Sequence, residues 1–445
     1  MPRIPIRYCW YFLIILHGIY FSYQLGKGRY VLKDSEEYIL AGENLLLEGI
    51  LYSGEWKGPK RIDFYTKRPP VYPALIGTVK WIGGFPFLLL LIQNVLSLVN
   101  FLLAWKLMQH LLALQQVKIN ESPFLPILIP LLILLYPAQF MYTNLVMTEI
   151  LFQFLLTSGI FSLLIALHSQ QAKYIIGYTL CLCLSIFTKP IMYLAAFPHL
   201  LGIGILSWRW RKLAMVTWAV IPLFLVLGYQ LHNQQRTGYY HFSSIQNLSL
   251  FQYTTYNLLS QEYGAERATA MNDSVLEVMF TIPSYEGQQK LISSYSIGIL
   301  QKHLIPYLAM HLKGMANFFL DPGRFDLYHF FGLEEVGGKG LQRTFSEEGY
   351  AGIWQYIATQ PIGVLCLLGL ILTGNLIRWG IVFWVLFNKR LPLEIRMVIG
   401  IFIVYVAGLT GTSGASRFAV PLFPISLGVV GYFWVAKNQL GKGSK

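Results

Sequence analysis

Long apolar runs recur along almost the whole of this 445-residue chain, and they restrict its fold more than any other feature. Hydrophobic residues make up 55% of the sequence and charged residues only 12%, whereas soluble globular proteins carry about 25% charged residues. Inside a bilayer the backbone must satisfy its own hydrogen bonds, and an apolar helix of about 20 residues does so. The sequence therefore predicts an all-α polytopic membrane protein.

The apolar runs and the basic loops between them predict ten membrane spans with both chain ends on the inner side. Arg3 and Arg7 precede the first run, which we interpret as a retained signal anchor from about Tyr8 to Tyr23. Loops rich in Lys and Arg mark the inner side, and Arg209-Trp210-Arg211-Lys212 is the strongest example. The other nine spans are expected at 85–112, 123–136, 145–166, to 188, to 208, to 229, at 361–388, at 397–409 and from 417 to Lys437. Arg378 interrupts the eighth, and we interpret it as a snorkelling arginine near the inner interface.

Three regions follow from this topology. Residues 1–230 are expected to form an N-terminal transmembrane core, with a catalytic first outer loop at 26–84. Residues 231–360 form an extracytoplasmic, mainly helical region, and residues 361–445 form C-terminal transmembrane helices. Short loops favour a bacterial inner membrane with the functional site on the periplasmic side. The net charge of +13 follows from the inner basic loops, so nucleic acid is not an expected partner.

The first outer loop opposes the orientation rule. Between Lys57 and Arg68 it carries five cations against the single acid Asp63, and these are Lys57, Lys60, Arg61, Lys67 and Arg68. One interpretation is solvated charge that the topology tolerates. The other is an anion site, because Lys and Arg together bind phosphate or pyrophosphate.

An acidic cluster stands at the start of the same loop. Asp34, Glu36 and Glu37 follow directly on the first apolar run. A surface helix from Tyr38 to Leu47 would place the glutamates at its N-terminus, where the helix dipole favours negative charge. Asp34 would precede that helix, as a cap or as a functional carboxylate.

Three more charges lie at the predicted outer ends of spans: Glu149, Lys189 and Arg417. An ionisable group near the membrane is costly and is a functional candidate by default, although each of these residues could equally form a structural ion pair. Together with Asp34, Lys67 and Arg68 they are expected at one membrane face.

The residues around these charges resemble a known superfamily. Asp34 is followed by Tyr38, Ala41, Asn44-Leu45-Leu46, Gly49-Ile50-Leu51-Tyr52-Ser53 and Arg68-Pro69-Pro70-Val71-Tyr72-Pro73. Further matching stretches are Tyr142-Thr143 before Glu149, Thr188-Lys189-Pro190 and Ser416-Arg417-Phe418. The pattern resembles the GT-C membrane glycosyltransferases, in the branch related to protein O-mannosyltransferases and lipid A aminoarabinose transferase. Ser35, Val71 and Lys189 depart from the residues usual in that group.

The resemblance implies a GT-C-like bundle of about 10 transmembrane helices, with surface helices in the first outer loop. It implies a polyprenyl-phosphate sugar donor, a lipid, glycan or protein acceptor, and inversion at the sugar with Asp34 as general base. Lys67, Arg68, Arg417 and Lys189 would bind the donor phosphate. Glu149, Glu37, Tyr38 and Tyr72 would position the acceptor or a cation. A divalent metal ion is an open cofactor assignment, because acidic residues are present without a spacing typical of metal ligands.

Two other functions remain open. A ligase or polymerase that uses a pyrophosphate-linked oligosaccharide would need the same cations. A lipid or solute transporter would bring polar residues to the middle of the membrane, whereas the charges here collect at the outer ends of spans. In the outer region, five aromatic residues are candidate carbohydrate contacts, although packing of short helices explains them equally well: Tyr239, Tyr240, His241, Tyr253 and Tyr256.

Overall fold

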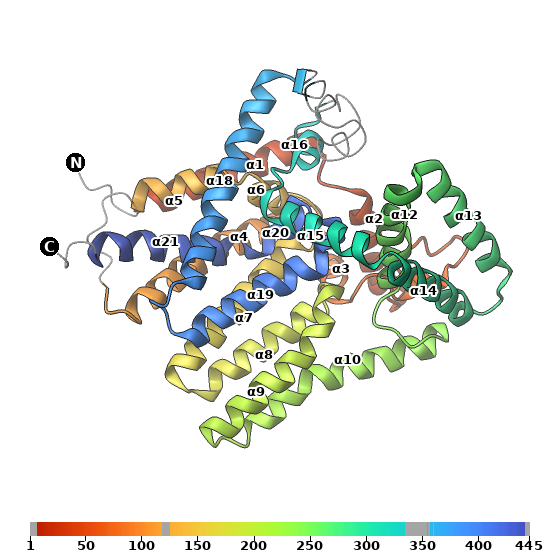
Figure 1. Cartoon of the computed structure of the whole chain (residues 1–445), viewed down its shortest axis with the longest axis horizontal. Coiled ribbons are helices and arrows are strands. Elements are labelled where there is room, and N and C mark those ends of the chain that lie inside the picture. The colour runs from red at the N-terminus through yellow and green to blue at the C-terminus, as the bar shows by residue number, and fades with distance from the viewer. Residues whose placement is uncertain (1–6, 118–124, 334–353, 355–356, 359, 441–445) are drawn as a thin grey trace.

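The computed structural model describes residues 7–117, 125–333, 354, 357–358 and 360–440, and within these residues it contains helices and no β-strand. Several residues used in the topology prediction lie outside the described residues: Arg3, Lys118, Pro123, Lys442 and Lys445. Figure 1 shows a bundle of long helices, with α5 and α21 at one end of the molecule and α12, α13 and α14 at the opposite end.

Seven helical segments of the described chain are long and apolar enough to cross a membrane. They are α4 (Phe87–Ala113), α7 (Glu149–Ser169), η3 with α9 (Pro190–Trp210), α10 (Met215–Thr237), α18 (Ile362–Phe387), α19 (Leu393–Thr410) and Ser416–Lys437, which combines α20 (Ser416–Ala419), η6 (Val420–Leu422) and most of α21 (Phe423–Leu440). The chain is therefore a multi-pass integral membrane protein, as the apolar runs predict.

Three of the ten predicted spans do not belong to these seven. α5 (Leu125–Leu134) and α8 (Ala172–Ile186) have 10 and 15 residues, too few to cross about 30 Å of hydrocarbon at 1.5 Å per residue. α1 (Arg7–Lys27) has 21 residues, but its many aromatic and polar side chains make it less apolar than the seven. Within the described residues, seven of the ten predicted spans thus meet these criteria.

Two details of the predicted spans are corrected. α10 continues to Thr237, eight residues beyond the predicted end near Tyr229. α18 runs without a break through Arg378, and that side chain is buried instead of snorkelling. Its Nη2 donates a hydrogen bond of 2.9 Å to Asn375 Oδ1, and its guanidinium lies 4.1 Å from the centre of the Tyr136 ring. A buried cation finds these partners inside the bundle, so it does not need to reach the interface.

The remaining helices lie before and between the spans. The first outer loop contains α2 (Lys33–Glu48), η1 (Ile62–Tyr65) and α3 (Val71–Trp81), and α6 (Ala138–Thr143) precedes α7. Between α10 and α18 follow α11 (Ile245–Ser249), η4 (Leu250–Thr255), α12 (Tyr256–Tyr263), α13 (Ala265–Thr281), α14 (Tyr285–Lys302), α15 (Leu304–Leu320) and α16 (Arg324–Phe331). η5 (Gly411–Ser413) joins α19 to α20.

A close backbone contact joins α2 to α3. A Cβ atom on Gly77 would lie 2.8 Å from the carbonyl oxygen of Gly42, and one on Gly42 would lie 2.8 Å from the carbonyl oxygen of Pro73. Side chains of both helices, including Tyr38 and Ile76, form a small apolar cluster beneath this contact. The glycines let these two helices of the first outer loop approach closely, and Leu89 of α4 in the same cluster joins them to the membrane bundle.

α4 carries a polar stripe on its buried face, which the sequence analysis did not identify. Gln93, Asn94, Ser97 and Asn100 are all buried. Asn94 donates to Asn144, Asn100 donates to Gln153, and Ser97 accepts from Gln139, with donor–acceptor distances of 2.8 to 2.9 Å. Such amide contacts between membrane helices contribute about 0.6 kcal/mol each. They join α4 to α6 and to α7, the helix that begins at Glu149.

Candidate functional site

The start of α2 carries the predicted acidic residues Asp34 and Glu37. α2 begins at Lys33, five residues before the predicted start of the surface helix, so Asp34 lies inside the helix instead of preceding it. The backbone N–H of Leu32 donates to Ser35 Oγ at 2.8 Å and starts the helix, whereas Asp34 does not cap it. Asp34 and Glu37 are three residues apart and therefore share one face of α2.

Lys67 and Arg68, just before α3, face these two carboxylates. Lys67 Nζ lies 2.7 Å from Glu37 Oε1, and Arg68 Nη2 lies 2.7 Å from Glu37 Oε2. Arg68 Nη2 also lies 2.9 Å from Asp34 Oδ1. The Arg68 guanidinium is 4.5 Å from the centre of the Tyr38 ring and donates to the Tyr38 hydroxyl at 3.2 Å. Tyr38 thus packs against the Arg68 guanidinium.

Arg417, on α20, reaches the same carboxylate from the other side. Its Nη1 lies 2.8 Å from Asp34 Oδ2, and its Nε lies 2.6 Å from Glu149 Oε1. Lys189 lies at the break between α8 and η3, and its Nζ is 3.1 Å from the same Glu149 oxygen. Glu149 is the first residue of α7. The structure thus brings together the loop before α3 and the starts of four helices, which are α2, α7, η3 and α20.

These seven side chains form one continuous chain of alternating charge, which we call the ion chain. Its members in order are Lys67, Glu37, Arg68, Asp34, Arg417, Glu149 and Lys189. Four cations meet three carboxylates, so the ion chain carries one positive charge in excess. The ion chain would therefore attract anions.

The ion chain is open at its middle and closed at one end. The Asp34 side chain is 38% exposed and that of Arg417 is 23% exposed, whereas Glu149 is fully buried at 0%. Lys189 is also buried. A ligand arriving from solution would reach Asp34 and Arg417 first, whereas Arg68, Glu149 and Lys189 are buried.

The neighbouring cations control the ionisation of Asp34. Burial alone would raise the pKa of this carboxyl group, but the charges of Arg68 and Arg417 and their hydrogen bonds outweigh burial and lower the pKa to about 2. Burial alone would lower the pKa of Arg68, but Tyr38, Glu37 and Asp34 raise it above its ordinary value. In this arrangement the Asp34 carboxylate and the Arg68 guanidinium are both charged at neutral pH.

Glu149 has one oxygen that remains unused. Its Oε1 accepts from both Arg417 and Lys189, whereas its Oε2 and the neighbouring Thr148 hydroxyl have no hydrogen-bond partner within the described residues. Because Glu149 is fully buried, it is placed to hold these two cations, and the structure does not expose it to an acceptor.

Tyr72, predicted to position the acceptor or a cation, lies in the interior of the protein. It is fully buried, and its hydroxyl donates to Gln93 Oε1 at 2.7 Å. Gln93 in turn donates to the carbonyl oxygens of Thr143 and Leu145. Tyr72 also packs edge-on against Tyr38, with ring centres 5.3 Å apart. It anchors α3 on α4 and supports Tyr38 from below.

The other cations of the first outer loop point elsewhere. Arg61 makes two hydrogen bonds to Asp63, at 3.1 and 2.9 Å, and is exposed. Lys60 lies 3.5 Å from the centre of the Trp56 ring. Of the five cations that suggested an anion site, Lys67 and Arg68 join the ion chain, whereas Lys60 and Arg61 make local contacts.

Residues 241–244, between α10 and α11, form hydrogen bonds with the part of the first outer loop that leads to Lys67 and Arg68. His241, predicted as a carbohydrate contact, is buried, and its Nε2 forms a hydrogen bond of 2.7 Å with the Thr66 hydroxyl. The Ser243 hydroxyl donates to the carbonyl oxygen of Lys67 at 3.0 Å, and the Ser244 hydroxyl donates to that of Asp63 at 2.7 Å. Residues 241–244 thus fix the backbone that presents Lys67 and Arg68, and His241 is not exposed to a sugar.

Two aspartates next to the ion chain were not identified from the sequence. Asp321 and Asp326 both accept hydrogen bonds from Ser416, the residue before Arg417. Asp321-Pro322-Gly323 is a recognisable turn signal. Nothing in a single sequence pairs that turn with a residue some ninety positions later, so the signal did not indicate a site.

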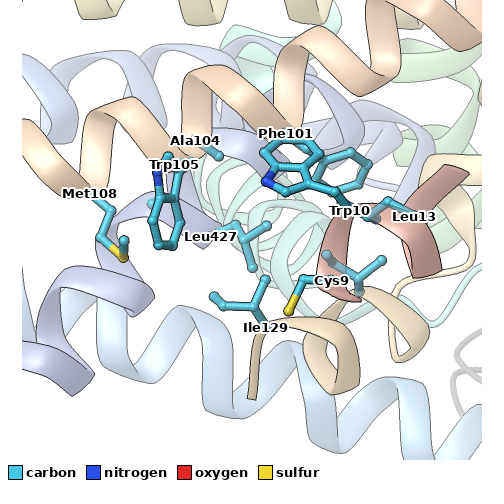
Figure 2. Close-up of a pocket in the computed structure, with 11 residues that line it drawn as sticks. Cys9, Trp10, Leu13, Phe101, Ala104, Trp105, Met108, Ile129 and Leu427 are labelled. Atoms are coloured by element: carbon cyan, nitrogen blue, oxygen red, sulfur yellow. The ribbon is translucent and has the colours of Figure 1, made fainter. Parts of the chain in front are cut away.

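Cavities and metal ligands do not add to this site. Among the described residues, no three His, Cys, Asp or Glu side chains come together to hold a metal ion. Figure 2 shows a pocket whose lining side chains come from α1, α4, α5 and α21. They are mainly apolar and include Cys9 and Trp10 from the start of α1, whereas Asp34 follows the end of that helix.

Comparison of the chain with protein-family models, with curated proteins and with solved structures finds no match. The case for a function therefore depends on the ion chain, its surroundings and the sequence resemblance described above.

Proposed function

We propose that this chain is a GT-C-like membrane glycosyltransferase, which transfers a sugar from a polyprenyl-phosphate donor to an acceptor at the outer face of a bacterial inner membrane. One observation carries the proposal. Asp34 is a partly exposed carboxylate placed between two guanidinium groups, and both belong to sequence motifs that resemble the GT-C enzymes. The acceptor is a lipid, a glycan or a protein.

The excess charge of the ion chain suits a phosphate diester. A polyprenyl-phosphate sugar carries one negative charge on its phosphate, which equals the single excess positive charge. Arg68 and Arg417 would exchange part of their contact with Asp34 for the phosphate oxygens, since guanidinium groups bind both anions through paired N–H donors. Lys67 and Lys189 would add charge at the two ends. As the leaving phosphate gains charge, the same cations would stabilise it.

The reaction needs a base for the acceptor. The acceptor hydroxyl or amine attacks the anomeric carbon, the bond from that carbon to the phosphate oxygen breaks, and the polyprenyl phosphate leaves with the electron pair. The acceptor proton passes to Asp34. Attack on the face opposite the leaving group inverts the configuration. Base catalysis of this kind contributes roughly 10²–10⁴ in rate.

Donor binding would also prepare the base. With a pKa of about 2, Asp34 is a weak base while it is paired with Arg68 and Arg417. A phosphate that takes over these guanidinium groups removes part of the charge that lowers the pKa of Asp34. The pKa would then rise toward the ordinary range for aspartate, so that the base becomes effective when the donor is bound.

A surface groove offers a place for the apolar tail of the donor. It lies between α9, α18 and α19, and Pro198, Met397, Ile401 and Val404 are among its lining residues. At this groove the Tyr405 hydroxyl donates to the carbonyl oxygen of Ile191, two residues after Lys189. An isoprenoid chain in this groove would therefore lie along helices that begin or end near the ion chain.

The decisive experiment compares sugar transfer by the wild type and by Asp34→Asn. Membranes that contain either protein are given radiolabelled sugars on polyprenyl phosphate. We expect transfer by the wild type and a loss of 10²-fold or more in Asp34→Asn, with donor binding retained. Asp63→Asn is the matched control, because the carboxylate of Asp63 lies in the same loop and, among the described residues, pairs with the exposed Arg61 alone. It should transfer at the wild-type rate.

Other outcomes point to other functions. Activity with pyrophosphate-linked oligosaccharides alone would assign the ion chain to a ligase or polymerase. If no donor supports transfer, while purified protein in vesicles moves a lipid or solute, the proposal is wrong and the chain is a transporter. Equal activity of wild type and Asp34→Asn would remove Asp34 from the catalytic role.

A further inference from the structure

The position of Arg417 depends on a backbone that has little support of its own. α19 ends at Thr410, η5 spans three residues, and α20 begins at Ser416 and has only four residues. Ala415 between them is extended, with φ of −144° and ψ of 159°. α20 continues through η6 into α21, and the first N–H groups of such a helical segment have no partners inside it. Contacts from elsewhere therefore satisfy the turn that presents Arg417.

Two carboxylates outside the ion chain hold this turn through Ser416. Asp321 Oδ2 accepts a hydrogen bond of 2.7 Å from the backbone N–H of Ser416. Asp326 Oδ2 accepts one of 2.6 Å from the Ser416 hydroxyl. Hydrogen bonds to ionised acceptors are about twice as strong as neutral ones. Arg417 itself pairs with Asp34 and Glu149, so these aspartates act on its backbone and not on its guanidinium.

Each aspartate is also fixed from a second direction. The other oxygen of Asp321 accepts from the N–H of Gly323 at 3.0 Å, and its backbone carbonyl accepts from Asn375 on α18 at 3.2 Å. The other oxygen of Asp326 accepts from the Tyr142 hydroxyl of α6 at 2.7 Å. The two carboxylates thus connect the Ser416 turn to α6 and α18, elements that are fixed in the bundle.

Glycines allow the outer chain to approach the turn closely enough for these contacts. A Cβ atom on Gly314 of α15 would lie 1.5 Å from the carbonyl oxygen of Gly411, and one on Gly414 would lie 1.8 Å from that of Gly314. Gly323 has a φ of +74°, and a Cβ atom there would lie 2.8 Å from Ser416 Oγ. The segment from Gly314 to Asp326 therefore lies directly against residues 411–416.

We infer that Asp321 and Asp326 are positioning residues for Arg417, which hold the Ser416–Arg417 backbone so that the guanidinium stays between Asp34 and Glu149. The inference rests on the proposed function only in that Arg417 is taken to bind the donor phosphate. It gives Asp321, between α15 and α16, and Asp326, on α16, a role in the site, although neither side chain belongs to the ion chain.

The test is a double-mutant cycle on ligand binding, with undecaprenyl phosphate as the probe. Asp321→Asn and Asp326→Asn keep the side-chain shape, but the amide NH₂ cannot accept, so one of the two donors at each site loses its partner. We expect each variant to raise the Kd about 10-fold, which corresponds to the loss of one charge-assisted hydrogen bond. In the Arg417→Ala background, neither substitution should raise the Kd further.

The control is Glu262→Gln, which removes an outer-region carboxylate that faces His303 and not Ser416. It should leave the Kd unchanged in both backgrounds. If the Asn variants do not purify as folded protein, Ser416→Ala and Tyr142→Phe each remove one hydroxyl donor to Asp326 and should weaken binding less. The inference is overturned if the Asp→Asn effects persist in full without Arg417. If the wild type does not bind undecaprenyl phosphate, the proposed function fails first and this inference fails with it.

Discussion

At the scale of single residues, Asp34 and Glu149 show how differently one kind of pairing can be used. Each carboxylate faces two cations, and in each case the partners come from distant parts of the chain. Asp34 is partly exposed, so a ligand can compete for its partners. Glu149 is sealed inside the protein, so its pairs are structural. Substitutions at the two sites should therefore affect different properties.

Glu149→Gln should strongly destabilise the protein. The change leaves Arg417 and Lys189 near a neutral amide in a buried position, and breaking a buried pair in this way costs about 3–5 kcal/mol. Thermal unfolding of the purified protein in detergent measures the loss. Glu43→Gln removes a partly exposed pair with Lys80 and should change stability by about 1 kcal/mol or less. Equal effects of the two substitutions would contradict the buried pairing of Glu149.

The pairing of Asp34 should make stability depend on pH in the acid range. Its pKa is lowered from 3.8 to about 2 in the folded protein, so the pairing contributes stability above pH 3.8 that is lost as the pH falls toward 2. The thermal midpoint of the wild type should fall across this window more steeply than that of Asp34→Asn, which has no proton to gain there. Parallel curves for the two proteins would show that Asp34 is not paired in solution.

At the scale of secondary structure, the close contact of α2 with α3 determines whether Asp34 and Glu37 face Arg68. The sequence signals the ends of both helices: Gly49 follows α2 with a φ of +68°, and Pro69-Pro70 precedes α3. It does not signal that Gly42 and Gly77 touch. Small residues at such a crossing allow backbones to approach in membrane proteins.

Gly77→Ala should separate α2 from α3. The added Cβ atom would lie 2.8 Å from a backbone oxygen of Gly42, which cannot move as a flexible side chain can. We expect loss of stability of about 1–3 kcal/mol from overpacking, together with weaker binding of polyprenyl phosphate. Gly298→Ala on α14 is the matched control, since nothing lies within 4 Å of its added Cβ atom. That variant should be neutral, or more stable by up to about 1 kcal/mol through helix propensity.

At the scale of the whole molecule, the proposal requires that the ion chain and the helices between α10 and α18 lie on one side of the membrane. Cations at the end of α9 and in the loops after α9 and α18 would mark the other side, among them Arg209, Lys212 and Lys389. The seven candidate spans fix that the chain crosses a membrane repeatedly. The direction of crossing stays a prediction from the charge of the loops.

Cysteine labelling tests this orientation. The four native cysteines, Cys9, Cys181, Cys183 and Cys366, are first replaced by serine. Single cysteines are then introduced at Ser274 on α13 and at Lys389 between α18 and α19, both of which are exposed. In intact bacterial spheroplasts, an impermeant maleimide should label Ser274→Cys and leave Lys389→Cys unlabelled until the cells are lysed. The opposite labelling pattern would place the ion chain on the inner side.

The sequence by itself determined that this protein is helical and embedded in a membrane, because apolar composition over about 20 residues dictates that outcome wherever the chain folds. It also indicated Asp34, Glu37, Lys67, Arg68, Glu149, Lys189 and Arg417, since charge at the end of an apolar run is unusual enough to notice. Only the tertiary structure decided which of these charges touch.

Pairing is a property of three-dimensional distance, and 383 positions separate Asp34 from Arg417 in the sequence. The same reason hid Asp321, Asp326 and the polar stripe of α4, whose partners lie on other helices. The burial of Tyr72 and His241 could not be predicted for the same reason, because the neighbours that cover them come from other parts of the chain.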